Sequence, residues 1–285
     1  MKFDRQQDDV GNILALEHVN LRAPDQSLAT QFYVGGLGFT RDPYMDFGPY
    51  NVWVNAGNQQ FHLPRGEPQV LRGCIGVVVP SLSALAIRLG RIERRMADTR
   101  FGYKVQKSSV VVTCPWGNLI KCSEPSRAKS NLAAPRVQLG IQYVEFQTRR
   151  EDLAGIARFY TQYFDAPTKL TKNTCEVSIG RYQTLRFRAS TKSSPYDGHH
   201  IAIYTVDFSG PYKRLKKKNL IAEESDQHQY RFDHIIDPDS GRLLYELEHE
   251  VRSLHHPMFS RKLVNRNAEQ SFANYRVGAD AFYPG

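Results

Sequence analysis

Short segments of alternating hydrophobic and polar residues dominate the chain and are separated by helical stretches. Alternation over residues 16–22 is typical of a half-buried strand. From Asp25 to Gly36, apolar residues recur at helical spacing between an Asp/Ser-rich start and a Gly-Gly end. Alternating stretches at 51–55 and 59–64 flank an Ala-Gly-Asn turn, which is typical of a hairpin. The pattern predicts a strand, a helix and further strands.

The same order starts again near residue 73. A strand is predicted over 73–79, and a helix follows from Leu82 to Leu89. Three more strands are predicted at about 101–107, 109–114 and 118–122. We therefore expect a strand, a helix and three strands, used twice in the first half of the chain.

The second half of the chain repeats the first. Val19 and Val144 are 125 positions apart, and both begin similar segments that continue to a Phe-Tyr pair. Gly117 and Gly241 are 124 positions apart and each lies in a turn before an apolar pair. Such a fixed spacing is the mark of an internal repeat. The sequence thus predicts an internal duplication, with four copies of one module.

Composition restricts the class of protein. The chain has 285 residues, of which 41% are hydrophobic and 24% are charged, which is typical of a globular protein of about two domains. No stretch approaches the about 18 apolar residues of a membrane span. Residues 1–12 have neither an apolar signal region nor the acid-poor character of a transit peptide, so a cytoplasmic location is predicted. The four cysteines form no CxxC pair, which favours reduced thiols.

The net charge of +9 is shared between the two halves. Its local concentrations, at Arg91–Arg95 and Lys213–Lys218, fit solvated helix faces. No basic run is interleaved with aromatic residues, so we expect no nucleic-acid partner. After the last strand a segment carries Tyr275, Phe282 and Tyr283. These aromatic anchors indicate packing on the body of the protein or on a second copy, as in a homodimer formed through this C-terminal extension.

An ordered set of motifs runs through both halves. Its members are His18-Val-Asn-Leu21, Phe32-Tyr33 with Leu37-Gly38-Phe39, Gln60-Phe-His62-Leu63, His200-Ile-Ala-Ile203, and Asp237-Pro-Asp-Ser-Gly241. In this order, over about residues 13–250, the set resembles the vicinal oxygen chelate superfamily of glyoxalases, bleomycin-resistance proteins and extradiol dioxygenases. The resemblance implies an α+β fold of four tandem βαβββ modules that form two glyoxalase-like half-barrel domains.

The resemblance also implies how the chain is divided. Residues 1–12 would form an N-terminal tail and residues 13–124 a first glyoxalase-like domain. A linker would follow at 125–138, where Ser, Ala, Pro and charged residues gather. Residues 139–250 would form the second glyoxalase-like domain, and residues 251–285 the C-terminal extension.

Members of this superfamily place metal ligands on the first, fourth, fifth and eighth strands of each half. The corresponding residues in the first half are His18, His62, Cys74 and Lys121. In the second half they are Tyr143, Arg186, His200 and Tyr245; Glu246 is one position away. A protonated Lys has no lone pair to give, so the resemblance implies a divalent metal (Fe, Mn, Ni or Zn) on His18 and His62.

Three functions remain open at this stage. The first is a metal-dependent lyase, isomerase or dioxygenase that acts on a small oxygen-rich molecule. The second is a metal-free protein that binds a small anionic molecule through Lys121, Arg186, His200, Tyr143 and Tyr245. The third is a structural or interaction subunit that keeps the fold without catalysis.

A second group of polar residues lies near the end of the repeat. It contains Glu248, His249, Glu250, His255 and His256. The spacing His-x5-His-His is not that of a known metal site, so no metal is predicted there.

Overall fold

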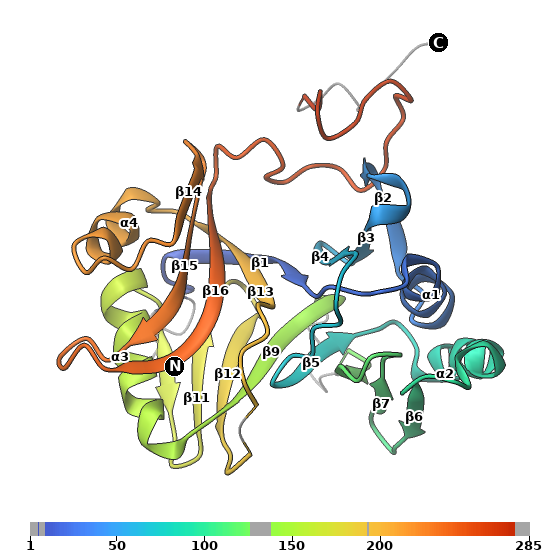
Figure 1. The fold of residues 1–285 in the computed structure, drawn as a ribbon, viewed down its shortest axis with the longest axis horizontal. Helices are drawn as coiled ribbons and strands as arrows, with labels where there is room; N and C mark the ends of the chain where they lie inside the picture. The colour runs from blue at the N-terminus through green and yellow to red at the C-terminus, as the bar shows by residue number, and fades with distance from the viewer. Residues whose placement is uncertain (1–4, 6–8, 126–137, 193, 277–285) are drawn as a thin grey trace. The chain divides into compact units, whose positions relative to one another are not determined.

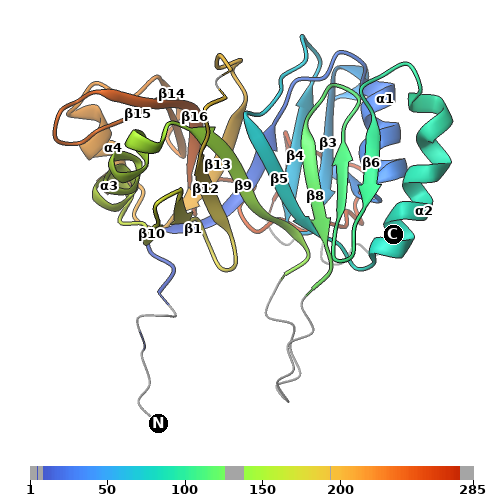
Figure 2. The same ribbon diagram turned by 90° about the horizontal axis from the view of Figure 1, so that it is seen from below.

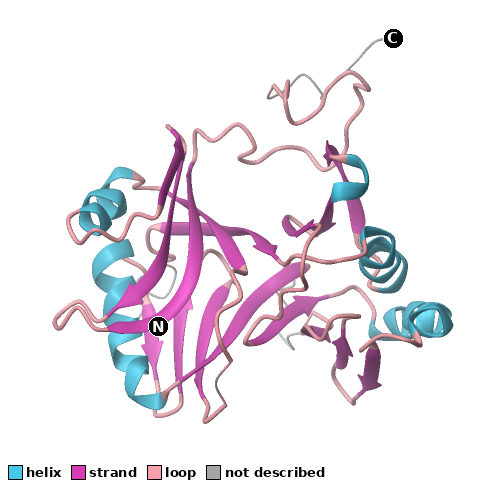
Figure 3. Cartoon of the chain, viewed as in Figure 1, coloured by secondary structure: helices cyan, strands magenta, loops and turns pink. Residues whose placement is uncertain are grey.

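The computed structural model describes residues 5, 9–125, 138–192 and 194–276. Within these residues the strands form two mixed sheets of eight strands each, with few helices (Figures 1 and 3). The strand orders are β14-β15-β16-β13-β1-β4-β3-β2 and β10-β11-β12-β9-β5-β8-β7-β6.

Each sheet is made of two modules with one shared topology. In every module the first strand pairs in parallel with the fourth, and the fourth, third and second strands pair antiparallel in that order. The strands of the first two modules are β1 (Ile13–Asn20), β2 (Thr40–Asp46), β3 (Asn51–Ala56), β4 (Gln59–Pro64), β5 (Gly73–Val78), β6 (Gly102–Val105), β7 (Val110–Thr113) and β8 (Leu119–Ser123).

The last two modules repeat this arrangement. Their strands are β9 (Gly140–Thr148), β10 (Thr168–Leu170), β11 (Thr174–Ser178), β12 (Thr184–Ala189), β13 (His200–Thr205), β14 (Glu223–Asp226), β15 (Gln229–Ile236) and β16 (Leu243–Ser253). The helix of each module follows its first strand: α1 (Gln26–Thr30) with the π-turn η2 (Gln31–Gly36), α2 (Leu82–Ile92), α3 (Leu153–Phe164) and α4 (Ser209–Lys216). The predicted α+β fold of four βαβββ modules is confirmed.

The chain divides into two compact units. Unit 1 combines Met1–Glu17 with Tyr143–Leu254, and unit 2 combines His18–Gln142 with His255–Gly285. Strand β1 is therefore divided between the two units at Glu17 and His18. The predicted domain boundaries, 13–124 and 139–250, stay a prediction.

In unit 2 the helices lie together on one side of the strands (Figure 2). Helix α2 begins at Ser81, whose Oγ accepts a hydrogen bond from the amide of Ala84 at 3.2 Å. It packs against η2, where a Cβ built at Gly36 would lie 2.5 Å from Cδ1 of Ile92. A larger residue at this position would require the end of the Ile92 side chain to shift. Beneath the helices, Val19 and Phe61 are fully buried.

In unit 1, helix α3 buries one apolar face on the sheet. Ile156, Phe159, Tyr160 and Phe164 recur at helical spacing and are fully buried. The helix ends at Asp165, which takes a left-handed conformation with φ of 50°. The core of unit 1 is thus rich in aromatic rings.

One strand was not predicted. Strand β2 (Thr40–Asp46) contains Pro43 and a register shift, so its residues do not alternate regularly. The carboxylate of Asp42 accepts hydrogen bonds from the amides of Tyr44 and Met45 at 2.9 and 3.0 Å and stabilises this irregularity. Most of the predicted linker and of the N-terminal tail lies outside the described residues.

The described part of the C-terminal extension packs on β2 and β3 of unit 2. Of the three predicted aromatic anchors, Tyr275 packs on Tyr44, whereas Phe282 and Tyr283 lie outside the described residues. The homodimer through this extension stays a prediction. Among the described residues, no helix is long and apolar enough to span a membrane.

Candidate functional site

Two of the predicted residues, His18 and His62, come from neighbouring strands of unit 2. In the parallel pair of β1 and β4, His18 lies opposite Gln60, and Asn20 lies opposite His62. Side chains alternate along a strand, and Val19 and Phe61 take the core face. Both histidines therefore point to the other face of the sheet.

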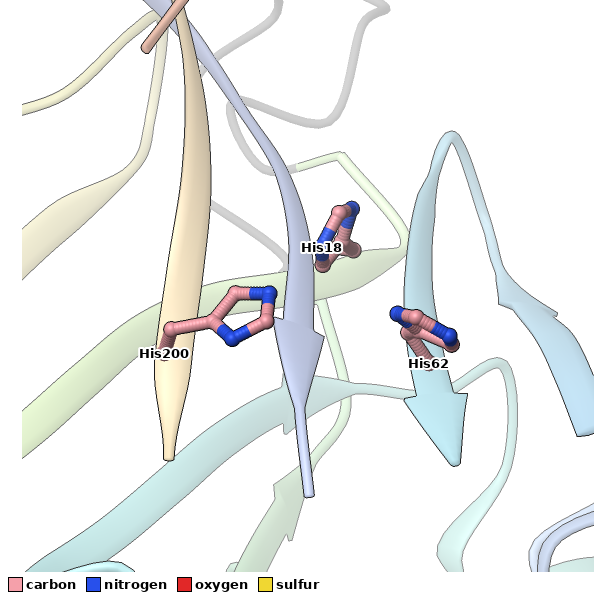
Figure 4. Close-up of side chains that lie close together, drawn as sticks. All are labelled: His18, His62 and His200. Carbon is pink, nitrogen blue, oxygen red and sulfur yellow. The ribbon is translucent and has the colours of Figure 1, made fainter. Parts of the chain in front are cut away.

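The two imidazoles form a small aromatic group with Trp53. The ring of His62 stacks on Trp53 with centroids 3.7 Å apart and an angle of 17°. His18 meets both rings edge-on, with centroids 5.0 Å from Trp53 and 5.5 Å from His62. His18 is only 1% exposed. Figure 4 shows the two imidazoles extending from β1 and β4, and labels His200 on β13 as well.

The pair has the chemistry of metal ligands. A ring nitrogen of His18 and one of His62 lie within 4.8 Å of each other. Two nitrogens bound to one ion at about 2.0–2.2 Å lie at most about 4.4 Å apart, so only small ring movements separate the pair from coordination. Among the described residues, the histidines that qualify as candidate metal ligands are His18, His62 and His200. Imidazole donors fit Zn, Fe, Ni and Cu.

His200 belongs to unit 1, where it lies beside two carboxylates. It is paired in register with Glu248 of β16. Its Nδ1 is 3.4 Å from Oε1 of Glu248, and its Nε2 is 3.8 Å from Oε2 of Glu250. Glu250 is 2% exposed. Unit 1 thus places a histidine and a carboxylate on the first and fourth strands of its last module.

Two arginines hold these carboxylates. Arg231 contacts Glu248 and Glu250 at 2.6 Å each, and Arg252 contacts Glu250 at 2.5 Å and Glu17 at 3.3 Å. Burial alone would lower the pKa of Arg252, but the neighbouring carboxylates of Glu17 and Glu250 outweigh it, and the pKa is raised. Burial raises the pKa of Glu248 although Arg231 opposes this effect. Together these side chains form a charge network in which Glu250 and Arg252 are buried and Arg231 and Glu248 are half-buried.

The opposite face of β16 belongs to the core. Tyr245 packs against Phe146 and Phe187, with centroids 5.9 and 5.6 Å apart. His249 is fully buried, and its two ring nitrogens lie 2.7 Å from the hydroxyl of Tyr160 and from the carbonyl of Leu247.

The remaining predicted residues lie in different places. Arg186 stacks over the ring of Tyr143 at 3.9 Å and contacts Glu176 at 3.3 Å, so the structure brings two of the predicted substrate-binding residues together in unit 1. In unit 2, Lys121 is exposed on β8 and Cys74 is half-buried on β5. The role of these residues in binding stays a prediction.

Sequence reasoning missed the roles of Glu250 and Trp53. The alternating sequence Glu246-Leu-Glu248-His-Glu250 could have identified Glu250. In a strand it places three carboxylates on the face opposite Tyr245. For Trp53 the signal is the hairpin turn. This turn places Ala56 opposite Gln59. Continuing away from the turn along both strands, one residue at a time, places Trp53 opposite His62.

Comparison with solved structures identifies relatives by fold. A candidate dioxygenase from Bacillus subtilis matches with a TM-score of 0.57 and 14% identity, covering 93% of this chain and 90% of that chain. Glyoxalase I from Zea mays also matches with a TM-score of 0.57 and 14% identity, covering 84% of this chain and 92% of that chain. No family model and no curated protein matches the sequence.

Proposed function

Because the chain has the vicinal oxygen chelate fold, we propose that it binds a divalent metal through His18 and His62 and uses the ion to hold a small molecule with neighbouring oxygen atoms. The observation that carries this proposal is the pair of imidazoles, His18 buried and His62 half-buried, with ring nitrogens within 4.8 Å. The names of the two structural relatives, a dioxygenase and a glyoxalase, support an oxygen-rich substrate.

The bound ion would polarise the substrate oxygens as a Lewis acid. The chain's own residues orient the two imidazoles for metal binding. Trp53 stacks on His62 and meets the edge of His18, which fixes the orientation of both rings and keeps water from one side of each. Two histidines leave coordination positions for substrate and for further ligands, as a catalytic site requires.

His200 and Glu250 are the next ligands to test. They occupy the first and fourth strands of the last module, which are the strand positions that His18 and His62 occupy in the first module. Glu250 forms ion pairs with Arg231 and Arg252, which hold its carboxylate in one orientation. We propose them as a separate candidate ligand pair within unit 1, on the basis of these positions.

Metal analysis tests the proposal. We expect purified protein to bind about one equivalent of Zn²⁺, Fe²⁺, Mn²⁺ or Ni²⁺, and His18→Ala and His62→Ala each to weaken binding by about 100-fold or more. His234→Ala is the matched control, since that side chain is 46% exposed on β15. His200→Ala and Glu250→Gln extend the series. Equal affinity in the wild type, His18→Ala and His62→Ala would overturn the proposal.

The same titration addresses the metal-free alternative. If the protein takes up no metal, small carboxylates and phosphates become the probes, and Arg186→Met becomes the variant of interest. Arg186 carries this alternative because its guanidinium lies half-buried over Tyr143.

A further inference from the structure

The C-terminal segment, residues 255–276, returns to the sheet that carries the two histidines. The amide of Phe272 donates to the carbonyl of Tyr44 at 3.2 Å, and the hydroxyl of Tyr44 donates to the carbonyl of Val264 at 3.3 Å. The ring of Tyr275 lies 5.1 Å from that of Tyr44. All these residues belong to unit 2, so the segment is anchored on β2 of its own unit.

One set of contacts connects the segment to His62. Met258 is 8% exposed and forms a cluster with Tyr44, Met45 and Trp53. Trp53 in turn stacks on His62 at 3.7 Å. Met258 thus belongs to the same buried cluster as the tryptophan that stacks on His62.

A second set of contacts leads toward His18. Arg261 forms an ion pair with Asp42, and the two side chains are 5% and 0% exposed. The same carboxylate accepts a hydrogen bond from Nε2 of Gln60 at 2.6 Å. Gln60 is the register partner of His18. An ion pair this deeply buried is costly to break, because removal of one partner leaves an uncompensated charge.

We propose that the C-terminal segment positions the metal-binding histidines, with Met258 acting on His62 through Trp53 and Arg261 acting through Asp42 and Gln60. The two residues are positioning residues, since neither touches the imidazoles directly. The inference rests on the proposed metal function where it concerns affinity. The arrangement around Trp53 can be tested without metal.

Three variants of buried methionines separate positioning from general stability. Met258→Ala removes most of one side chain from the cluster that contains Trp53, whereas Met258→Leu nearly conserves the volume. Met96→Ala is the matched control, because Met96 is 1% exposed in the same unit but lies on the helical turn after α2. We expect Met258→Ala to weaken Co²⁺ binding about 10-fold, and Met258→Leu and Met96→Ala to change it by less than about twofold.

A metal-free measurement runs in parallel. The chain has two tryptophans, so Trp116→Phe isolates the fluorescence of Trp53. In this background, we expect Met258→Ala to raise acrylamide quenching about threefold, and the proton shifts of the His62 ring to move with it. Arg261→Met should speed chymotryptic cleavage of the segment at least about fivefold, whereas Lys262→Met, at an exposed position, should not.

The outcomes distinguish the two proposals. If the wild type binds no Co²⁺, the proposed metal function fails, and the fluorescence and NMR measurements still decide the positioning role. If Met258→Ala leaves the Co²⁺ affinity, the quenching and the His62 shifts unchanged, the positioning proposal is overturned. Equal weakening by Met258→Ala and Met96→Ala would overturn it as well, because loss of stability alone would then explain the effect.

Discussion

At the scale of single residues, two histidines of one repeat show how strand alternation assigns roles. His200 and His249 belong to the same module, on neighbouring strands. His200 faces the carboxylates of Glu248 and Glu250, whereas His249 faces helix α3 and takes no part in the charge network. The environment on each side of the sheet, and not the residue type, decides which histidine is available for chemistry.

Burial of His249 makes stability depend on pH. Its Nδ1–H donates to the carbonyl of Leu247, so Nε2 accepts from the hydroxyl of Tyr160 and the ring stays neutral. Burial lowers the pKa of His249 to about 3. The unfolded chain takes up this proton near its ordinary pKa, so the stabilisation is complete above about pH 6.5 and is lost as the pH falls toward 3.

We expect this group to contribute a loss of about 2 kcal/mol between pH 7.5 and pH 5. Urea denaturation at the two pH values measures it, with His249→Gln as the reference that removes the titrating group. The explanation fails if the wild type and His249→Gln lose the same free energy of unfolding over this interval.

Cysteine reactivity follows from burial in the same way. Cys114, Cys122 and Cys175 are fully buried, and burial raises the pKa values of Cys122 and Cys175 to about 12. Only the thiolate reacts, so these residues should be inert in the folded protein. Cys74 is half-buried. A disulfide exchange reagent should therefore label one thiol rapidly in native protein and four after unfolding, and Cys74→Ser should remove the rapid phase.

At the scale of elements, the close contact of η2 with α2 depends on Gly36. A Cβ at this position would lie 2.5 Å from Cδ1 of Ile92 and 3.5 Å from Cδ2 of Leu89. The substitution forces side chains away from their favoured rotamers. A side chain at position 36 therefore requires Ile92 to move.

Gly36→Ala should lower the free energy of unfolding by about 1–3 kcal/mol. Ile92→Val removes the atom that clashes, so the double variant should recover part of the loss, and the cycle of four proteins gives the coupling. Gly102→Ala is a suitable control, because a Cβ at that position would meet nothing within 4 Å. Purely additive effects of Gly36→Ala and Ile92→Val would contradict this account.

At the scale of the whole molecule, most of the fold was predicted from the sequence repeat. Val19 and Val144 are equivalent positions on the first strands of two modules, and the shared strand order of all four modules follows from the repeat. Strand β2 escaped prediction because Pro43 and a register shift interrupt its alternation.

The site was predictable only in part. His18 and His62 followed from the repeat and the resemblance. Glu250 did not, because the alignment selected Tyr245, which lies five positions earlier and on the other face of β16. The contacts of Met258 and Arg261 join residues about 200 positions apart, and no local pattern encodes such pairs.

The division of β1 between the two units affects when each unit can fold during translation. Unit 1 needs residues before His18 as well as those up to Leu254, and unit 2 is completed by residues beyond Leu254. Synthesis proceeds from the N-terminus, so unit 1 cannot close before Leu254 has left the ribosome, and unit 2 cannot close before the segment that follows Leu254. Until the C-terminal segment is synthesised, Tyr44 and Trp53 lack the residues that cover them in the folded chain. We therefore expect nascent chains to depend on chaperones during translation.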